Sequence, residues 1–148
     1  MKNMVYILGL LFLSIMVSWK DIKYRKIPNP LVIFTLLFTS LLSISLGYFT
    51  QTVGIAVLVL IAAMLLWRKG FIGGGDIKLL AVFVVGVAPQ YQILVLLLLT
   101  CATFAQLVVV LIFCRSRCHG LSLDKGIPLG IPISFSYWLG CLLSVLSA

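Results

Sequence analysis

The sequence predicts an all-α polytopic membrane protein with six transmembrane helices, and three observations support this fold class. Hydrophobic residues make up 63% of the 148 positions and charged residues only 9%. A soluble domain of this length could not bury so much apolar surface, so the solvent is expected to be lipid. The apolar runs are long and continuous, without the alternation of a membrane β-barrel. Basic residues gather in the short loops between the runs. We expect residues 1–148 to form a single membrane-embedded domain.

The apolar runs predict the helices in chain order. The first run, Met4 to Val17, ends without the small-residue cleavage pattern of a signal peptide, so it is expected to remain as a transmembrane helix. Asn29 and Pro30 form a plausible N-cap and first position for a second helix that runs from Leu31 to about Tyr48. A polar break at residues 50–52 precedes the third helix. The remaining helices are expected over residues 53–67, 77–88, 93–113 and from about 128–132 to the end of the chain.

The fourth helix is unusually short. Ile77 to Ala88, halted by Pro89, would measure only about 18 Å at 1.5 Å per residue. A hydrocarbon core is ~30 Å thick. Either the bilayer thins there, or the glycine-rich end of the helix lies below the membrane surface and is reached by water. The sequence leaves both possibilities open.

The distribution of charge predicts the orientation. Eleven Lys and Arg residues oppose three acidic residues, for a net charge of +8. Six crossings from an external N-terminus would place all of the basic residues except Lys2 on one face, in the segments 20–26, 68–78 and 115–125. By the positive-inside tendency that face is expected to be cytoplasmic. The expected partners of this face are anionic lipids rather than nucleic acid.

The segment Gly73-Gly74-Gly75-Asp76 is the most distinctive motif of the chain. Consecutive glycines allow a sharp turn or the close approach of another chain. Asp76 opens an apolar run, where a carboxylate is favoured as an N-cap, so a loop with a helix cap is the simplest interpretation. The chain has only two other acidic residues, Asp21 and Asp124. Because acids at a membrane boundary are costly and rare, a catalytic role is the alternative.

Asp21 and Asp76 are expected on the same membrane face and could form an aspartyl dyad. Two close carboxylates share a proton, so that one activates water while the other donates to the scissile carbonyl. Serine chemistry lacks a suitably placed base, because the single histidine, His119, lies in another loop. Zinc-protease chemistry lacks its H-E-x-x-H motif. No cofactor is expected, and Asp124 is expected to be a solvated loop charge.

A metal site has little support in the sequence. Cys114, Cys118 and His119 cluster, but zinc generally needs three or four ligands and no further ligand is nearby. All four cysteines are expected to be thiols without a disulfide framework.

Two motifs of this chain resemble the signatures of the type IV prepilin peptidases, which are GxGD membrane aspartyl proteases. They are Asp21 with the segment 25–29 (Arg-Lys-Ile-Pro-Asn), and Gly73 to Leu79. The segment 127–132 (Ile-Pro-Leu-Gly-Ile-Pro) also resembles the entry to the last helix of the family. The resemblance implies a protein of the bacterial cytoplasmic (inner) membrane with a catalytic pair, Asp21 and Asp76, that acts on the cytoplasmic side without a metal.

The same resemblance suggests further roles. Gly73 and Gly75 would shape the backbone around the dyad or against the substrate, and Lys78 would neutralise charge beside it. The implied substrates are prepilins or pilin-like proteins with a short basic leader before an apolar helix. The chain resembles short, peptidase-only members, so N-methyltransferase activity is not expected. The alternatives are a small transporter or channel component whose acids handle ions or protons, and a non-catalytic membrane scaffold.

Overall fold

The computed structural model describes residues 2–69, 73–116 and 129–148, which form six α-helices and one short 3-10 helix. The elements are α1 (Lys2–Tyr24), α2 (Asn29–Ser45), α3 (Phe49–Arg68), α4 (Gly74–Gly86), η1 (Pro89–Tyr91), α5 (Gln92–Ser116) and α6 (Gly130–Leu146). The predicted all-α fold and the order of its helices are confirmed.

The apolar character of the helices identifies an integral membrane protein. Three helical segments are long and apolar enough to cross a bilayer, namely Asn3–Tyr24, Phe49–Arg68 and Pro89–Ile112. Two shorter apolar helices, Asn29–Ser45 and Gly130–Leu146, accompany them. Large hydrophobic side chains such as Leu58, Ile93 and Phe104 are well exposed. Such a surface is stable in contact with lipid and unfavourable in water.

Helix α4 lies at the centre of the bundle. It packs against α2, α3 and α6, and most of its side chains beyond the first turn are buried, with Leu79 and Phe83 fully so. Its 13 residues correspond to about 20 Å of helix, so it is as short as the sequence predicted. Because neighbouring helices surround it, its length does not have to match the thickness of the lipid.

The ends of α4 are fixed by specific contacts. Pro89 follows its C-terminus, as predicted, and begins η1. The Gln92 side-chain amide donates hydrogen bonds to the carbonyls of Val84 and Val87, at 2.9 and 2.8 Å. These bonds satisfy acceptors that a helix C-terminus otherwise leaves unpaired.

Two predicted helix boundaries were wrong. The turn between α2 and α3 lies at Gly47, with φ +80°, rather than at residues 50–52, which belong to the first turn of α3. Gly47 N–H bonds to the Ile44 carbonyl and Tyr48 N–H to the Ser43 carbonyl, which is the Schellman arrangement that glycine favours. Asn29 is not the N-cap of α2, because Pro28 occupies that position. No side chain caps this end of the helix with a hydrogen bond.

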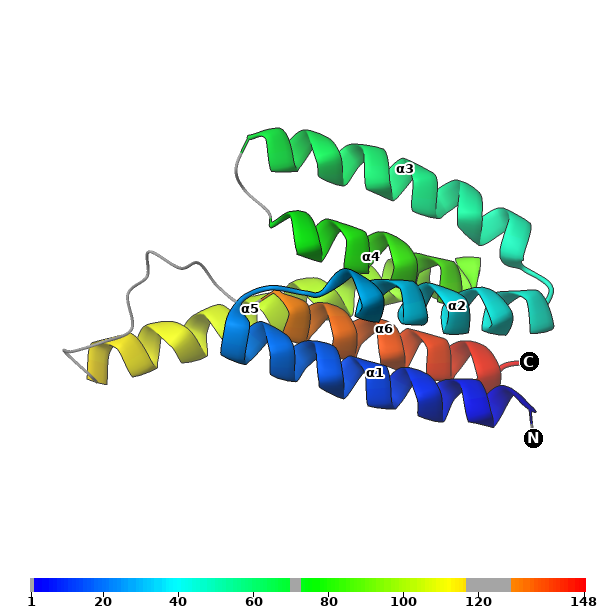
Figure 1. Ribbon diagram of the computed structural model, residues 1–148, viewed down its shortest axis with the longest axis horizontal. Helices are drawn as coiled ribbons and strands as arrows, with labels where there is room; N and C mark the ends of the chain where they lie inside the picture. The colour runs from blue at the N-terminus through cyan, green and yellow to red at the C-terminus, as the bar shows by residue number, and fades with distance from the viewer. Residues whose placement is uncertain (1, 70–72, 117–128) are drawn as a thin grey trace.

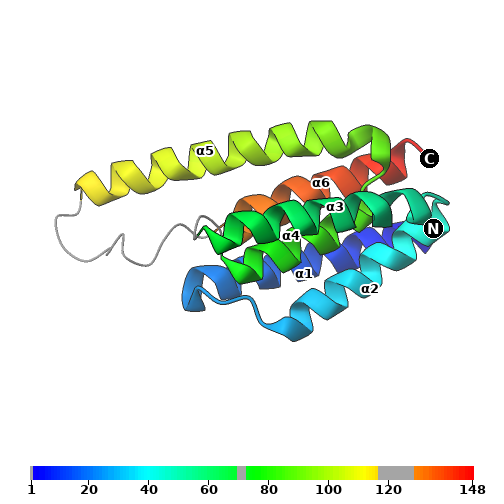
Figure 2. The ribbon, with the colours of Figure 1, turned by 90° about the horizontal axis from the view of Figure 1, so that it is seen from above.

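The helices run roughly along one axis, with the connections gathered at two ends (Figure 1). The α1–α2 connection and the N-terminus of α4 lie at one end, which we call the site end. Both chain termini lie at the opposite end (Figure 1). Helix α5 diverges from the bundle and extends beyond it at the site end, as the view from above shows (Figure 2).

Candidate active site

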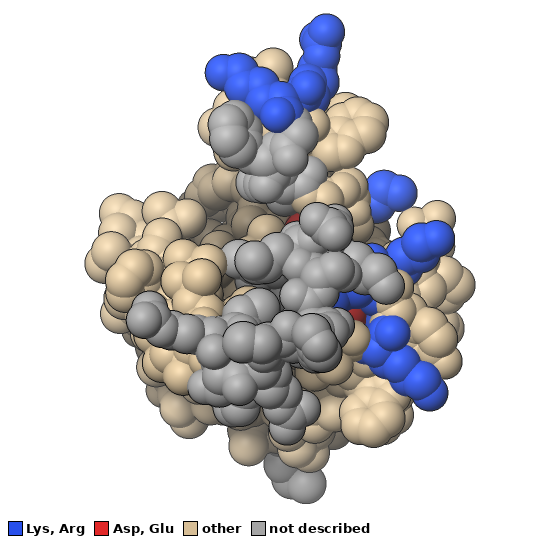
Figure 3. Space-filling model, turned by 90° about the vertical axis from the view of Figure 1, so that its left-hand side faces the viewer, with Lys and Arg blue, Asp and Glu red and all other residues tan. Residues whose placement is uncertain are grey.

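The structure places both predicted aspartates at the site end. Asp21 lies in the last turn of α1 and Asp76 in the first turn of α4. Basic side chains lie at the top and along the right of this end of the described structure, and two small patches of acidic side-chain atoms are visible on the same face (Figure 3). Residues 55 positions apart in sequence (76 minus 21) therefore come to the same level of the bundle.

Asp21 is buried and held by the start of α6. Its side chain is only 5% exposed. Its Oδ2 accepts a 2.8 Å hydrogen bond from the backbone N–H of Gly130, the first residue of α6. Because the first N–H groups of a helix have no partner within the helix, they favour a negatively charged acceptor. Gly130 thus offers Asp21 a fixed donor that stabilises the ionised carboxylate.

The lack of a side chain at Gly130 is what permits this contact. A Cβ placed there would lie 2.7 Å from Asp21 Oδ2 and 3.0 Å from Asp21 Cγ, which is closer than real Cβ contacts. Sequence reasoning noted the segment 127–132 but assigned no role to Gly130. A glycine at the start of a helix, beside two prolines, was the available signal.

The end of α1 brings a positive charge to Asp21. Arg25 follows the last turn of α1 with φ +53°, a left-handed conformation that ends the helix. Its backbone N–H donates to the Asp21 carbonyl at 3.0 Å. The Arg25 charge also acts on the Asp21 carboxylate.

Asp76 is not the N-cap of α4, contrary to the simplest interpretation of the sequence. Gly73 is the N-cap, which makes Asp76 the third residue of the helix. Its side chain turns back toward the cap, because a Cβ on Gly73 would lie 2.9 Å from Asp76 Oδ2. A carboxylate at this position suits the positive end of the helix dipole.

Asp76 has an altered proton affinity. It lies in the first turn of α4, outside the segments long enough to span the membrane. Burial, and secondarily the negative charge of Asp21, raises the pKa of Asp76 from 3.8 to about 6. The two carboxyl groups are therefore close enough to interact electrostatically, and Asp76 keeps a proton more readily than a free aspartate does.

Gly75 and Lys78 both belong to the first turns of α4, close in sequence to Asp76. Gly75 does not have a positive φ, and a Cβ there would meet Ile27 Cβ at 3.4 Å, an ordinary contact. Lys78 is exposed, and its Nζ donates to Asn29 Oδ1 at 3.3 Å, which joins α4 to α2. Asn29 serves this bridge instead of capping its helix.

A cleft opens beside Asp76. It has a volume of about 190 Å³ and is lined by α3, α4, α5 and the start of α6. Leu129 and Ile133 of α6 form part of its wall. Gly130, which binds Asp21, lies between these two residues in the chain, so the same end of α6 contacts Asp21 and borders the cleft beside Asp76.

The geometry can support acid–base chemistry. Both aspartates are at least partly buried; Asp21 accepts a helix N–H bond, and Asp76 has a raised pKa and feels the charge of Asp21. Two interacting carboxyl groups can share a proton, so that one acts as base and the other as acid in the same reaction.

A family model for the type IV leader peptidase family matches residues 7–111. The chain belongs to this family. The matched range includes both Asp21 and Asp76 and ends before α6 begins, so the resemblance at residues 127–132 lies outside it. Membership in the leader peptidase family implies aspartic peptidase activity and suggests prepilins as substrates. Searches of the curated proteins and of the solved structures found no match.

The cluster of Cys114, Cys118 and His119, which the sequence offered as a possible metal site, falls outside what the structure describes. Cys118, His119 and Asp124 lie outside the described residues, and so does the side chain of Cys114. Among the residues that are described, no group of three or more His, Cys, Asp or Glu could hold a metal ion.

Proposed function

We propose that this leader peptidase family member is an aspartic endopeptidase that uses Asp21 and Asp76 to cleave the basic leader from prepilins or pilin-like proteins. The observation that carries the proposal is the electrostatic interaction of the two carboxyl groups at one end of the bundle. The match to the family over the segment that contains both aspartates supports the same conclusion.

The surroundings of each aspartate assign it a role. In its carboxylate form Asp21, which the Gly130 N–H holds in place, takes a proton from water as the water attacks the scissile carbonyl carbon. Asp76, whose raised pKa of about 6 lets it carry the proton at mildly acidic pH, donates it to the carbonyl oxygen. The tetrahedral diol then collapses: the C–N bond breaks, the amine leaves with the proton that Asp21 had taken, and one diol hydroxyl returns a proton to Asp76 as the carboxyl product forms.

We further propose that all six helices belong to one membrane domain and that the site end faces the cytoplasm. Seven Lys and Arg side chains of the described structure lie near that end, namely Lys20, Lys23, Arg25, Lys26, Arg68, Lys69 and Lys78. An excess of such residues marks cytoplasmic loops. The site would then meet the leader on its cytoplasmic side, and the basic surface would meet anionic lipid headgroups.

The position of the acids favours a peptidase over an ion or proton carrier. A carrier is expected to hold its acids near the middle of the membrane and facing a pore. Here both aspartates occupy terminal turns of their helices, at one end of the bundle and not at its middle.

The test is cleavage of a prepilin-like substrate by purified variants. Asp21→Asn and Asp76→Asn are each expected to abolish cleavage and to leave the fold intact, since the amide oxygen of the Asp21→Asn side chain can still accept the Gly130 N–H bond. Asp124→Asn removes the remaining acid of the chain and is the matched control, with cleavage expected at the wild-type rate. Retention of cleavage by either dyad variant would disprove the proposal.

A further inference from the structure

A groove on the surface of the bundle lies between α1 and α6, and we call it the α1–α6 groove. It has a volume of about 350 Å³, and its walls are one face of α1 from Leu11 to Ile22 and one face of α6 from Ile131 to Trp138. Along α1 this range corresponds to about 16 Å of helix. No Lys, Arg, Asp or Glu lies among the described residues that line it. The groove is therefore a part of the surface that faces lipid.

Hydrogen bonds between α1 and α6 fix the spacing of the groove walls. At the site end the Gly130 N–H donates to Asp21. Toward the other end the Trp138 indole N–H donates to the carbonyl of Ile7 at 3.2 Å. Because both bonds join the same two helices, the groove is present in the folded chain before anything enters it.

Two serine hydroxyls among the groove-lining residues have no hydrogen-bond partner in the described part of the chain, those of Ser14 and Ser134. The two residues are only 6% and 1% exposed. An unpaired hydroxyl is unfavourable in an apolar environment, and most buried polar groups in proteins are paired. A rotation about χ1 can turn a serine hydroxyl toward the groove. The two serines therefore favour an occupant that carries a polar group.

A second lipid-facing groove, between α2 and α3, lacks this feature. It also has a volume of about 350 Å³, and its lining is apolar except for Ser40. No unpaired buried hydroxyl lies among its described lining residues. Lipid chains can fill that groove without leaving a polar group unpaired, so only the α1–α6 groove favours a different occupant.

The depth of the serines argues against a lipid chain as the occupant of the α1–α6 groove. Trp19 marks the level of the headgroups, because tryptophan is enriched at the membrane interface. Ser14 lies five residues (19 minus 14) from Trp19, which is about 7.5 Å deeper along the helix. Lipid at that depth is hydrocarbon without donors or acceptors. A transmembrane helix does supply them, since serine and threonine hydroxyls form hydrogen bonds between helices in membranes.

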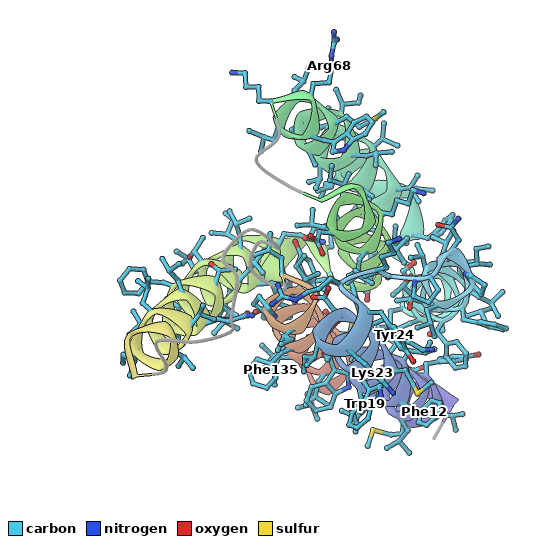
Figure 4. The ribbon with its side chains drawn as sticks, turned by 60° about the vertical axis from the view of Figure 1, so that its left-hand side comes forward. Phe12, Trp19, Lys23, Tyr24, Arg68 and Phe135 are labelled. Atoms are coloured by element: carbon cyan, nitrogen blue, oxygen red, sulfur yellow. The ribbon has the colours of Figure 1, made fainter. Side chains whose placement is uncertain are left out.

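A stripe of exposed side chains beside the groove indicates which helix fits it. The stripe consists of five apolar residues of α1 that recur every three or four positions and are 59–65% exposed, namely Leu8, Phe12, Ile15, Trp19 and Ile22. The labelled side chains of Phe12, Trp19 and Phe135 extend from α1 and α6 on the side of the bundle opposite α3 (Figure 4). Stripe and groove share one face, so two copies related by a two-fold axis can each pack the stripe into the groove of the other.

Two copies in one membrane also match in depth. Each copy inserts with the same orientation, because its own basic residues set that orientation. The two-fold axis between them is then perpendicular to the membrane, and every residue lies at the depth of its counterpart. Ser14 and Ser18 of one copy therefore meet the same serine-bearing level of the other. Ser18 donates to the Ser14 carbonyl at 2.8 Å, and its oxygen can still accept a hydrogen bond from the second copy.

The exposed area of this face approaches what a dimer needs. Phe12, Trp19 and Phe135 are each about three-fifths exposed. Aromatic side chains present 150–250 Å² each, so these three contribute roughly 350 Å². A stable interface buries about 800 Å² on each partner, and the aliphatic residues of the stripe extend the same face toward that area.

We propose that a second copy of this chain packs against the face formed by α1 and α6, so that the exposed stripe of each copy enters the α1–α6 groove of the other. The result is a two-fold dimer in the membrane, with the hydroxyls of Ser14, Ser18 and Ser134 paired across its interface. The cleft beside Asp76 is lined by other residues, which include Leu129 and Ile133, so the second copy leaves that cleft open. The dimer does not depend on the proposed peptidase chemistry.

The first test fills the groove with a larger side chain. Ser18→Leu adds an apolar side chain inside it, and Ser40→Leu makes the same change at a partly exposed serine of the groove between α2 and α3, as the matched control. Energy transfer between donor- and acceptor-labelled copies is measured in phosphatidylethanolamine–phosphatidylglycerol vesicles over a range of protein-to-lipid ratios. We expect a dimer for the wild type and for Ser40→Leu. For Ser18→Leu we expect the dissociation constant to rise about tenfold, because the added side chain occupies the space that the stripe of the second copy needs.

The second test uses no bulky substitution. In a chain whose native cysteines are replaced by alanine, Ile15→Cys places a thiol at the centre of the face, and Ile33→Cys places one at a similarly exposed position of α2. Oxidation in the same vesicles is expected to link Ile15→Cys copies into disulfide dimers and to leave Ile33→Cys copies unlinked.

Three results would overturn the dimer. The first is a monomeric wild type, which would leave the face to lipid. The second is an equal dissociation constant for Ser18→Leu and Ser40→Leu. The third is the absence of disulfide dimers from position 15. Failure of the wild type to cleave a prepilin-like substrate would instead refute the peptidase and leave the dimer standing, so the two failures are distinguishable.

Discussion

Gly130→Ala is the substitution that tests the site geometry most directly. An alanine Cβ would lie 2.7 Å from Asp21 Oδ2 and 3.1 Å from Asp21 Cβ. An ordinary contact is at least 3.4 Å, so the carboxylate oxygen must move by about 0.7 Å, the difference between 3.4 and 2.7 Å. Such a shift would lengthen the 2.8 Å bond from Gly130 N–H toward 3.5 Å, beyond the usual range of a hydrogen bond.

The cost follows from the burial of Asp21. With only 5% of its side chain exposed, water cannot readily replace the lost donor. A hydrogen bond to a charged group contributes about 1.5–3 kcal/mol, and each 1.4 kcal/mol is a factor of ten. We therefore expect kcat to fall roughly 10- to 100-fold, with KM little changed because Gly130 acts through Asp21.

The assay is steady-state cleavage of a prepilin-like substrate, with the thermal midpoint Tm measured on the same preparation. Gly54→Ala is the matched control, because a Cβ on that α3 glycine meets no atom within 4 Å. It should cleave at the wild-type rate. If Gly130→Ala also cleaved at the wild-type rate, with an unchanged Tm, the inference that the Gly130 N–H positions Asp21 would be refuted.

Three further predictions concern the other parts of the site end. Gly73→Ala should lower kcat several-fold, because its Cβ would lie 2.9 Å from Asp76 Oδ2. Gly75→Ala is the control and should cleave normally, because its nearest Cβ contact is at 3.4 Å. Equal cleavage rates for the two variants would contradict this geometry. Because the pKa of Asp76 is about 6 in the fold and 3.8 in the reference state, the folded chain binds that proton more tightly than the unfolded chain does. The free energy of unfolding should therefore decline as pH rises from about 4 to about 6, and activity should decline above about pH 6. Tm is measured across this pH range, and an Asp76→Asn variant with the same pH dependence as the wild type would argue against the raised pKa of Asp76. In a chain without native cysteines, Lys69→Cys should react with a membrane-impermeant thiol reagent only from the cytoplasmic side. Labelling from outside would show that the site end faces away from the cytoplasm.

The helices could be predicted from the sequence because lipid leaves the backbone few choices. A chain in hydrocarbon must satisfy its N–H and C=O groups internally, so each long apolar run becomes a helix. The errors were local. At the start of α4 an aspartate is favoured both as N-cap and in the first turn, and the structure places Asp76 in the first turn, after Gly73. Near the end of α2 the glycine at position 47 sets the turn, and not the polar residues that follow.

The position of the site was partly predictable for the same reason. Counting helices brings Asp21 and Asp76 to one membrane level, and the structure places both at one end of the bundle. The counting could not show what holds each carboxyl group. Nor could it show that Gly75 lies within α4 without a positive φ, or that the Lys78 Nζ donates a hydrogen bond to Asn29 of α2.

The sequence by itself determined that the protein lies in a membrane, how many helices it forms and which acids meet at one end, since these follow from local chemistry and from the alternation of the helix direction. Only the tertiary structure decided that α4 is enclosed by its neighbours, that α6 begins against Asp21 and that a cleft opens beside Asp76. Gly130 and Asp21 are separated by 109 positions, and the cleft is built by four helices. Contacts over such distances depend on how the helices pack side by side, and in lipid that packing depends on close fit rather than on a pattern of apolar residues.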